Sequence, residues 1–208
     1  MKKKNFANKL YYLWLYYKWP LLAGLLAVFV SVCFLFAILT KKETILSVML
    51  IDCHTDVSAD RMETDFLLEA GFDPAKSQAE FVTSLLFADA ESGSYTMTSL
   101  SRFLADIGSE KLDVCGMLEE DFINYDNSQT WLDLSTFLDA DMLSRLEGSF
   151  LEKDGRLIGI YTDALPVLEA YDCYGIPGKR GVLGVIYNSP HKEAAEKYLQ
   201  YVAGDRFT

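Results

Sequence analysis

An uncharged apolar run near the N-terminus restricts the fold of this chain more than any other feature. Residues 19–40, WPLLAGLLAVFVSVCFLFAILT, contain no Asp, Glu, Lys or Arg. Because a helix rises about 1.5 Å per residue, a helix of this length crosses the roughly 30 Å hydrocarbon core of a bilayer. Pro20 stands where a helix start tolerates proline, and the aromatic-rich stretch before it is typical of a membrane interface. The run predicts one transmembrane helix.

Lysines flank this run unequally. Five precede it and two follow it, and an excess of positive charge marks the cytoplasmic side. The bias predicts a basic, aromatic cytoplasmic stub over residues 1–18 and an extracytoplasmic domain over residues 41–208. A cleaved signal peptide is the alternative, but the run is longer than a signal-peptide core and no small-residue cleavage site precedes Lys41. We therefore expect an uncleaved anchor in the cell membrane, with the lipid bilayer as its partner.

The part of the chain after the apolar run is strongly acidic. Seven of the 19 basic side chains lie in the first 42 residues, so 12 basic side chains face all 30 acidic ones, a net charge of −18. Such a surface repels nucleic acid phosphates and anionic lipid head groups. We expect no nucleic acid partner. Cationic and neutral partners remain compatible, and the acidity is also an ordinary means of staying soluble.

Strand-like and helix-like segments alternate along the acidic part. Short apolar runs predict strands at 45–53, 80–87, 111–118 and 180–189. Helical periodicity predicts helices at 60–71, 99–108 and 190–204, with shorter ones at 119–128 and 139–148. The segment 130–139 reads as extended or irregular. This alternation predicts a single three-layer α/β domain with a mostly parallel sheet covered on both faces.

A tight turn stands out between two strand-like arms in FLEKDGRLIGIYTD, residues 150–163. Asp154-Gly155 is a strong signal for a two-residue hairpin turn, because both residues tolerate a positive φ. The segment therefore predicts a β-hairpin.

Motifs for catalysis and metal binding are missing from the sequence. It contains no phosphate-binding glycine loop, no G-x-S-x-G and no H-E-x-x-H, and its two histidines are His54 and His191. The cysteines Cys53, Cys115 and Cys173 follow no zinc spacing, so buried thiols are the default and one disulfide is the alternative. We expect no enzyme activity, no cofactor and no metal.

The best candidate site follows the first predicted strand, in the segment IDCHTD. Ligands of open α/β sheets bind at the carboxyl ends of the strands, where loops and helix N-termini converge. Residues after the second and third strands should reach the same edge. The candidate ligand-binding residues are Asp52, His54, Thr55, Asp56, Ser94, Tyr95 and Glu119.

Each of these residues also has an ordinary structural explanation. Asp52 to Asp56 can form a polar turn with a capping Asp, and Ser94 with Tyr95 can belong to a mobile connector. Glu119 can complement a helix dipole. Trp131 can stack on a sugar ring or anchor the core. The sequence leaves these alternatives open.

The order of several segments resembles a known family. SLSRFLADIGSEKLDV, DFINY, TWLDLSTFL, DGRLIGI and GVIYNSPHKEAAEKYLQYV follow one another. This order is similar to that of the extracytoplasmic solute-binding proteins of bacterial ABC importers, which have the type-two periplasmic-binding-protein fold. The likeness extends over most of the acidic part, and it implies an α/β domain like one lobe of such a protein.

The chain departs from this family after the hairpin. There the family crosses into a second lobe before it returns, whereas here only residues 163–180 separate the hairpin from the returning strand. The resemblance therefore implies a membrane-anchored protein reduced to one lobe. We expect a non-enzymatic binding or accessory role beside a transport or sensing protein. The alternative is the solute receptor of an ABC importer, binding a small polar or cationic ligand.

Overall fold

The structure is a computed structural model that describes residues 17, 19–20, 22–35, 42–87, 93–126 and 130–204. The chain divides into two compact units, Met1–Lys42 and Glu43–Thr208. In the first unit, residues 22–35 are helical. Within the described ranges, no helix is both long enough and apolar enough to cross a membrane. Position 21 and positions 36–40 of the predicted span lie outside the described residues.

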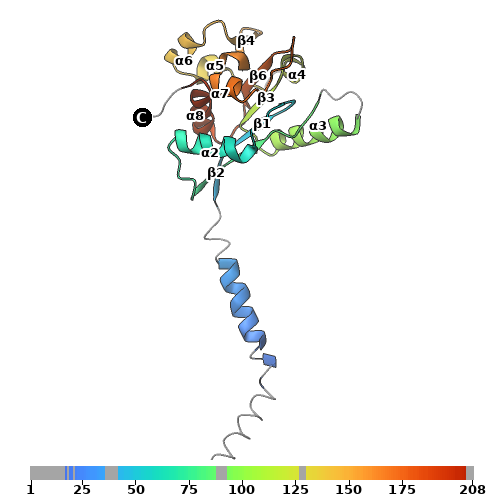
Figure 1. Cartoon of the computed structure of the whole chain (residues 1–208), viewed down its shortest axis with the longest axis vertical. Coiled ribbons are helices and arrows are strands. Elements are labelled where there is room, and N and C mark those ends of the chain that lie inside the picture. Colours follow the sequence, from blue (N-terminus) through green and yellow to red (C-terminus); the bar gives the residue numbers. More distant parts are fainter. Residues whose placement is uncertain are drawn as a thin grey trace, which may run out of the picture. The chain divides into compact units, whose positions relative to one another are not determined.

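The second unit is a mixed α/β domain (Figure 1). Its strands are β1 (Glu43–Leu50), β2 (Ser77–Val82), β3 (Val114–Leu118), β4 (Phe150–Lys153), β5 (Arg156–Tyr161) and β6 (Gly181–Val185). Its helices are α2 (Ala59–Glu69), α3 (Gly93–Gly108), α4 (Glu119–Asn124), α5 (Leu134–Phe137), α6 (Ala140–Arg145), α7 (Pro166–Ala170) and α8 (Lys192–Val202), with a 3-10 turn η1 at Thr162–Ala164. The order of the predicted strands and helices is confirmed, and the structure adds α5, η1 and α7, which were not predicted.

The segment predicted as extended or irregular, 130–139, contains the short helix α5. Asp133 caps this helix, since its carboxylate accepts hydrogen bonds from the Ser135 N–H at 3.0 Å and from the Leu157 N–H at 3.2 Å. Side-chain capping satisfies a backbone donor that has no partner within the helix. The cap therefore explains a helical turn that apolar periodicity does not reveal.

The six strands form one sheet in the order β2-β1-β3-β6-β5-β4. β1 pairs in parallel with β2 and β3, whereas the pairings β3 with β6, β6 with β5 and β5 with β4 are antiparallel. The prediction of a mostly parallel sheet is therefore correct for one half and wrong for the other. A parallel connection needs a crossover that runs the length of the sheet. The segment between β5 and β6 holds the three-residue turn η1 and the five-residue helix α7, which together are too short for a crossover, so the chain re-enters the sheet from the same end.

Both faces of the sheet are buried, which gives three layers. In β1, Leu46 and Val48 pack against one core and Met49 against the other. The first core contains α2 and α8, where the Phe66 ring lies 5.5 Å from the Tyr198 ring, centroid to centroid. The second core contains side chains of α3 and α4. Figure 1 shows α2 and α8 next to each other and α3 extending to the other side.

The predicted hairpin is confirmed. β4 and β5 pair in antiparallel register with Lys153 opposite Arg156, and Asp154 and Gly155 have φ of 52° and 74°. Asp126, buried beside the turn, accepts a hydrogen bond from Arg156 at 3.0 Å and lies 3.5 Å from the Lys153 ammonium. One carboxylate thus holds both strands of the hairpin next to the turn.

Trp131 is a core anchor, since it is 1% exposed. Its indole ring stacks on Phe122 with centroids 3.8 Å apart, and its Nε1–H donates to the Phe122 carbonyl at 3.1 Å. A Cβ at Gly184 would lie 2.5 Å from the Phe122 ring. The glycine therefore leaves the space that the stacked pair occupies, and Trp131 does not serve as a sugar platform.

A buried carboxylate, Asp113, joins three parts of the domain just before β3. It accepts hydrogen bonds from the Ser47 N–H of β1 at 2.7 Å and from the Ser189 hydroxyl at 2.6 Å. It also accepts from the His191 N–H at 3.2 Å and lies 3.0 Å from His191 Nδ1. Because a buried charge is tolerated only when hydrogen bonds satisfy it, these contacts fix β1, β3 and the start of α8 relative to one another.

Replacing this carboxylate should destabilise the domain. Asp113→Ala leaves the buried Ser47 N–H and Ser189 hydroxyl without an acceptor, and we expect the free energy of unfolding to fall by about 3 kcal/mol. Urea unfolding of a fragment beginning at Glu43 measures this change, since Trp131 is then the only tryptophan and reports through its fluorescence.

The matched control is Asp106→Ala, since Asp106 pairs at the surface with Arg102 at 3.5 Å. An exposed pair of this kind contributes little, so we expect a change within about 0.5 kcal/mol. Equal losses in the two variants would contradict the role assigned to Asp113.

Candidate functional site

Four strands and the return of the chain meet at one edge of the sheet. The carboxyl ends of β1, β2 and β3 lie there, and β6 begins there because Gly181 pairs with Leu118 at the end of β3. β2 and β3 flank β1 on opposite sides. The connections that leave β1 and β3 therefore run toward opposite sides of the sheet. Ligands of open α/β sheets bind outside such a switch point.

A hollow of about 600 Å³ lies at this edge. The residues after β3 supply its carboxylates, and the loop before β6 supplies its cations. It is lined by Phe87, Leu118, Glu119, Glu120, Asp121, Ile123, Gly178, Lys179 and Arg180. The hollow is therefore mixed in charge, with one aromatic and two aliphatic side chains.

Asp52 is a buried support of this hollow. It is 1% exposed and adopts a φ of 55°, a left-handed conformation that Asp tolerates better than most residues. Its Oδ1 accepts a hydrogen bond from the Phe87 N–H at 2.8 Å, and its own N–H donates to the Leu85 carbonyl at 2.9 Å. Asp52 thus fixes the loop after β2 that carries Phe87.

His54, Thr55 and Asp56 do not line the hollow, and His54 and Thr55 bond to the segment before β6. The His54 N–H donates to the Cys173 carbonyl at 3.0 Å, and the Thr55 hydroxyl donates to the Tyr171 carbonyl. Thr55 Oγ1 also accepts from the Val57 N–H at 3.1 Å. The side chains of His54 and Asp56 are exposed. None of the three lines the hollow.

The remaining predicted residues follow β2 and β3. Ser94 and Tyr95 lie in the first turn of α3, and their side chains are outside the described part of the structure. Glu119 lines the hollow. Of the predicted set, the structure thus brings Glu119 and the supporting Asp52 to one site, and it joins His54 and Thr55 to the segment before β6.

A chain of polar contacts fixes the wall of the hollow. The Tyr161 hydroxyl donates to Glu119 Oε1 at 2.8 Å, and the Arg180 guanidinium lies over the Tyr161 ring, 3.5 Å from its centroid. Arg180 also donates from Nε and Nη2 to the two Asp163 oxygens at 3.0 and 2.9 Å. Desolvation and the hydrogen bond to Glu119 raise the pKa of Tyr161, so its hydroxyl stays a donor at neutral pH.

Asp121 is the perturbed acid of the hollow. Partial burial raises the pKa of its carboxyl, and the neighbouring Asp52 and Glu120 carboxylates raise it further, while Lys179 opposes them. These three carboxylates therefore repel one another when all are ionised. A bound cationic group would relieve that repulsion.

Among the described residues, no group of three or more His, Cys, Asp or Glu is placed to hold a metal ion. Family models, curated proteins and solved structures give no match to this chain.

Lys179 and Arg180 are the cationic residues of the hollow, and neither belongs to the predicted set. They precede β6, and in a mostly parallel sheet a strand parallel to β3 would place its N-terminal end at the opposite edge. The signal that could have found them is the short connection itself, because residues 163–180 are too few for a crossover that covers the sheet.

Neutralising Asp121 should stabilise the domain at neutral pH. The pKa of the Asp121 carboxyl is raised in the folded state. The stability of the domain therefore falls as pH rises from 3.8, the ordinary pKa of the group, through the folded pKa. Asp121→Asn removes that loss, so we expect a higher melting temperature at pH 7 and a smaller difference from wild type at pH 3. Thermal unfolding at the two pH values measures this.

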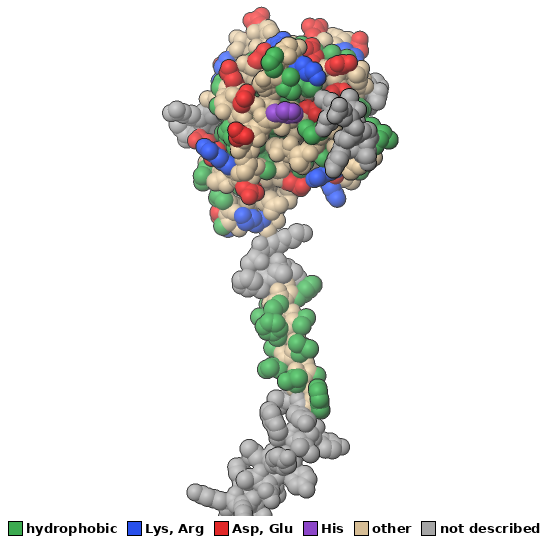
Figure 2. Space-filling view, turned by 45° about the vertical axis from the view of Figure 1, so that its right-hand side comes forward, with side chains coloured by type: hydrophobic (Ala, Val, Ile, Leu, Met, Phe, Trp, Pro, Cys, Tyr) green, Lys and Arg blue, Asp and Glu red, His purple; other side chains and the backbone are tan. Residues whose placement is uncertain are grey.

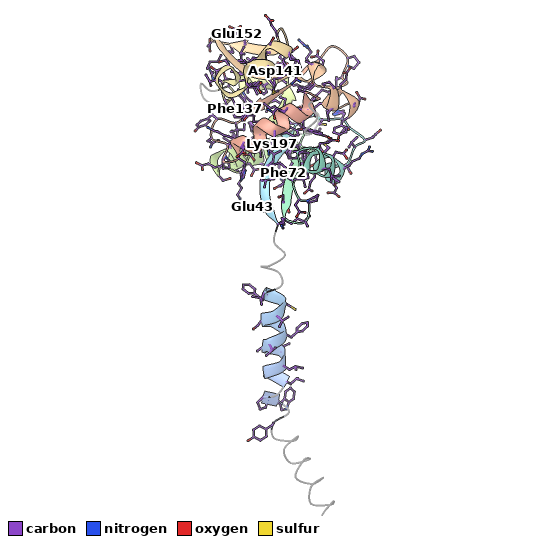
Figure 3. The ribbon with its side chains drawn as sticks, turned by 90° about the vertical axis from the view of Figure 1, so that its left-hand side faces the viewer. Glu43, Phe72, Phe137, Asp141, Glu152 and Lys197 are labelled. Atoms are coloured by element: carbon purple, nitrogen blue, oxygen red, sulfur yellow. The ribbon has the colours of Figure 1, made fainter. Side chains whose placement is uncertain are left out.

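Asp141→Asn is the matched control, because Asp141 also lies in the first turn of a short helix, α6, and is exposed (Figure 3). We expect no gain from it. A gain for Asp121→Asn that is the same at both pH values would argue against charge repulsion in the hollow.

Proposed function

We propose that this chain is a non-enzymatic, single-pass membrane protein that displays a one-lobe, solute-binding-protein-like domain outside the cell. Its role is binding or accessory, beside a transport or sensing protein. The observation that carries the proposal is the course of residues 163–180. This segment turns back at the carboxyl edge of the sheet and enters β6, so the described chain supplies one wall of the hollow.

The returning segment is part of the core of the lobe. Leu165 and Cys173 are fully buried, and the Tyr171 hydroxyl donates to Asp65 Oδ2 at 2.9 Å and lies 3.1 Å from the Tyr201 hydroxyl. These contacts tie the segment to α2 and α8. A solute held between two lobes is buried on both sides, whereas this edge leaves the hollow available to a partner.

The proposed anchor is supported by the apolar run at 19–40 and by its described portion. Residues 22–35 are helical, and their large apolar side chains are exposed, among them Leu25 at 69% and Phe34 at 68%. Figure 2 shows green side chains on this helix. An apolar surface of this kind on an isolated helix requires a cover, and lipid supplies one.

The charge of the domain supports a partner that is cationic or neutral at its contact. Figure 2 shows Asp and Glu side chains spread over the visible face of the domain. Spread charge favours solubility, whereas the hollow adds apolar contacts through Phe87 and Ile123. A partner that combines a cationic group with an apolar surface fits this edge.

Ser189, His191 and Asp113 lie together, but their hydrogen bonds do not follow the order of a catalytic triad. Ser189 and His191 both bond to Asp113, at 2.6 Å from the hydroxyl and 3.0 Å from Nδ1. In a catalytic triad the base bonds to the nucleophile and the acid bonds to the base. Here the Ser189 hydroxyl donates directly to the Asp113 carboxylate and not to the imidazole, and Ser189 is buried. These three side chains therefore stabilise the fold.

The orientation can be tested with fusions to the C-terminus of the full chain. Alkaline phosphatase folds only outside the cytoplasm and many fluorescent proteins only inside it, so we expect phosphatase activity without fluorescence. Fluorescence without phosphatase activity would place the domain in the cytoplasm and refute the proposed topology.

The binding role can be tested by crosslinking in membranes followed by purification of the full chain. We expect a membrane transport or sensing protein to be captured, and Ile123→Arg, which places a charge at the hollow, to reduce capture about tenfold or more, or about 1.4 kcal/mol. Leu68→Arg is the control, since Leu68 is an exposed apolar residue of α2 away from the hollow. Equal capture by both variants would exclude this edge as the interface.

A second candidate function is the receptor of an importer, favoured by the three carboxylates of the hollow. Sugars, amino acids, peptides and metal ions serve as probes in a thermal unfolding screen. A ligand at a hundred times its Kd should add about 2.7 kcal/mol of stability. We expect a cationic ligand to lose this effect in Glu120→Gln/Asp121→Asn and keep it in Asp141→Asn/Glu147→Gln. No shift with any probe would exclude this candidate.

A further inference from the structure

Three cysteines of the domain divide between the two faces of the sheet. Cys53 and Cys173 belong to the core beside α2 and α8, and both are buried. Cys115 belongs to the core on the other face. The sheet therefore separates Cys115 from the other two, and of the three possible pairs only Cys53 with Cys173 shares a core.

The backbone holds these two cysteines next to each other. The residue after Cys53 donates its N–H to the Cys173 carbonyl at 3.0 Å, and the Thr55 hydroxyl donates to the Tyr171 carbonyl. The Cys173 side chain is the largest influence on the pKa of the Cys53 thiol, through a side-chain contact. A disulfide needs Cα atoms about 4.4–6.8 Å apart, and the backbone bond between the two segments makes such an approach possible.

We propose that Cys53 and Cys173 are a disulfide site that joins the end of β1 to the segment before β6, while Cys115 remains a thiol. Formation in the cell rests on the proposed extracytoplasmic placement, since disulfides persist in oxidising compartments. The site itself rests on the geometry alone.

Both thiols are shielded in the folded domain, since Cys53 is 7% exposed and Cys173 is 0% exposed. Cys173 lies at a second hollow of about 260 Å³, together with Asp172, Gly175 and Lys179, whereas Cys53 does not line it. The contact with Cys173 and burial both raise the pKa of the Cys53 thiol. This hollow is the described opening next to the pair.

The reaction is an exchange with a disulfide oxidant such as glutathione disulfide or an oxidoreductase disulfide. The thiolate of one cysteine attacks one oxidant sulfur and releases the other as a thiolate. The second cysteine then loses its proton and attacks the protein sulfur of the mixed disulfide, which releases the second oxidant thiol. The two protein thiols lose two protons and two electrons, and one oxidant disulfide becomes two thiols.

The product would lock residues 163–180 against the end of β1. The hydrogen bonds of His54 and Thr55 hold this contact without covalent help. With the disulfide, the segment that turns the chain back could not lift from the edge of the sheet. The lobe would keep its single wall when a partner binds.

Peptide mapping of the purified full chain tests the site. The protein is incubated with glutathione disulfide, alkylated, and digested with trypsin without reduction. We expect peptides 43–61 and 157–179 to be linked, because they carry Cys53 and Cys173, and peptide 112–145 with Cys115 to be alkylated. Reduction before alkylation should abolish the link.

Two variants control this result. Cys115→Ser should keep the link between 43–61 and 157–179, and Cys53→Ser should lose it. A link that includes peptide 112–145, or no link in the oxidised wild-type protein, would overturn the proposed site.

A second arm separates the site from the placement of the domain. The chain is alkylated in intact cells and isolated without added oxidant, then mapped in the same way. A link in both arms supports the site and its use in the cell. A link only after added glutathione disulfide supports the site and contradicts the extracytoplasmic placement.

Discussion

The buried carboxylate of Asp113 is the interaction on which the arrangement of the domain depends. Its four hydrogen bonds, at 2.6 to 3.2 Å, end on β1, on the loop after β6 and on the start of α8. Its backbone adds bonds to Ser47 and Ile186. Charge-assisted bonds in a low-dielectric core are strong only when geometry is fixed. The segments KLDV and NSPH, far apart in the sequence, therefore belong to one polar centre of the fold.

The short return of the chain after β5 then decides what the opposite edge can do. Because α7 is too short to traverse the sheet, β6 runs antiparallel to β3 and brings Lys179 and Arg180 to the edge where Glu119 and Asp121 lie. The mixture of charges in the hollow follows from this connection. The direction of one strand thus sets the chemistry of the candidate site.

Sequence patterns predicted the strands and helices of the domain better than the pairing and direction of the strands. Apolar runs and the Asp154-Gly155 turn identified the strands and the hairpin, since these signals are local. The direction of β6 depends on where the connection between β5 and β6 packs, and no local sequence pattern predicts that. The position of His54 depends on a similar relation: it follows β1 as expected, but its backbone N–H bonds to the Cys173 carbonyl and it does not line the hollow. Asp52 was found, although as a buried support of Phe87.

The two outer strands, β4 and β2, form the two open edges of the sheet. β4 has four residues, a register shift between Leu151 and Glu152, and the exposed Glu152 labelled in Figure 3. β2, at the other end, exposes Glu80, which lies 3.5 Å from Arg102. A short, irregular outer strand such as β4 and a charged residue on an outer strand such as β2 both oppose the addition of a strand from another molecule. Neighbouring copies concentrated on one surface would therefore remain separate at both ends of the sheet, and would not join into continuous β-structure.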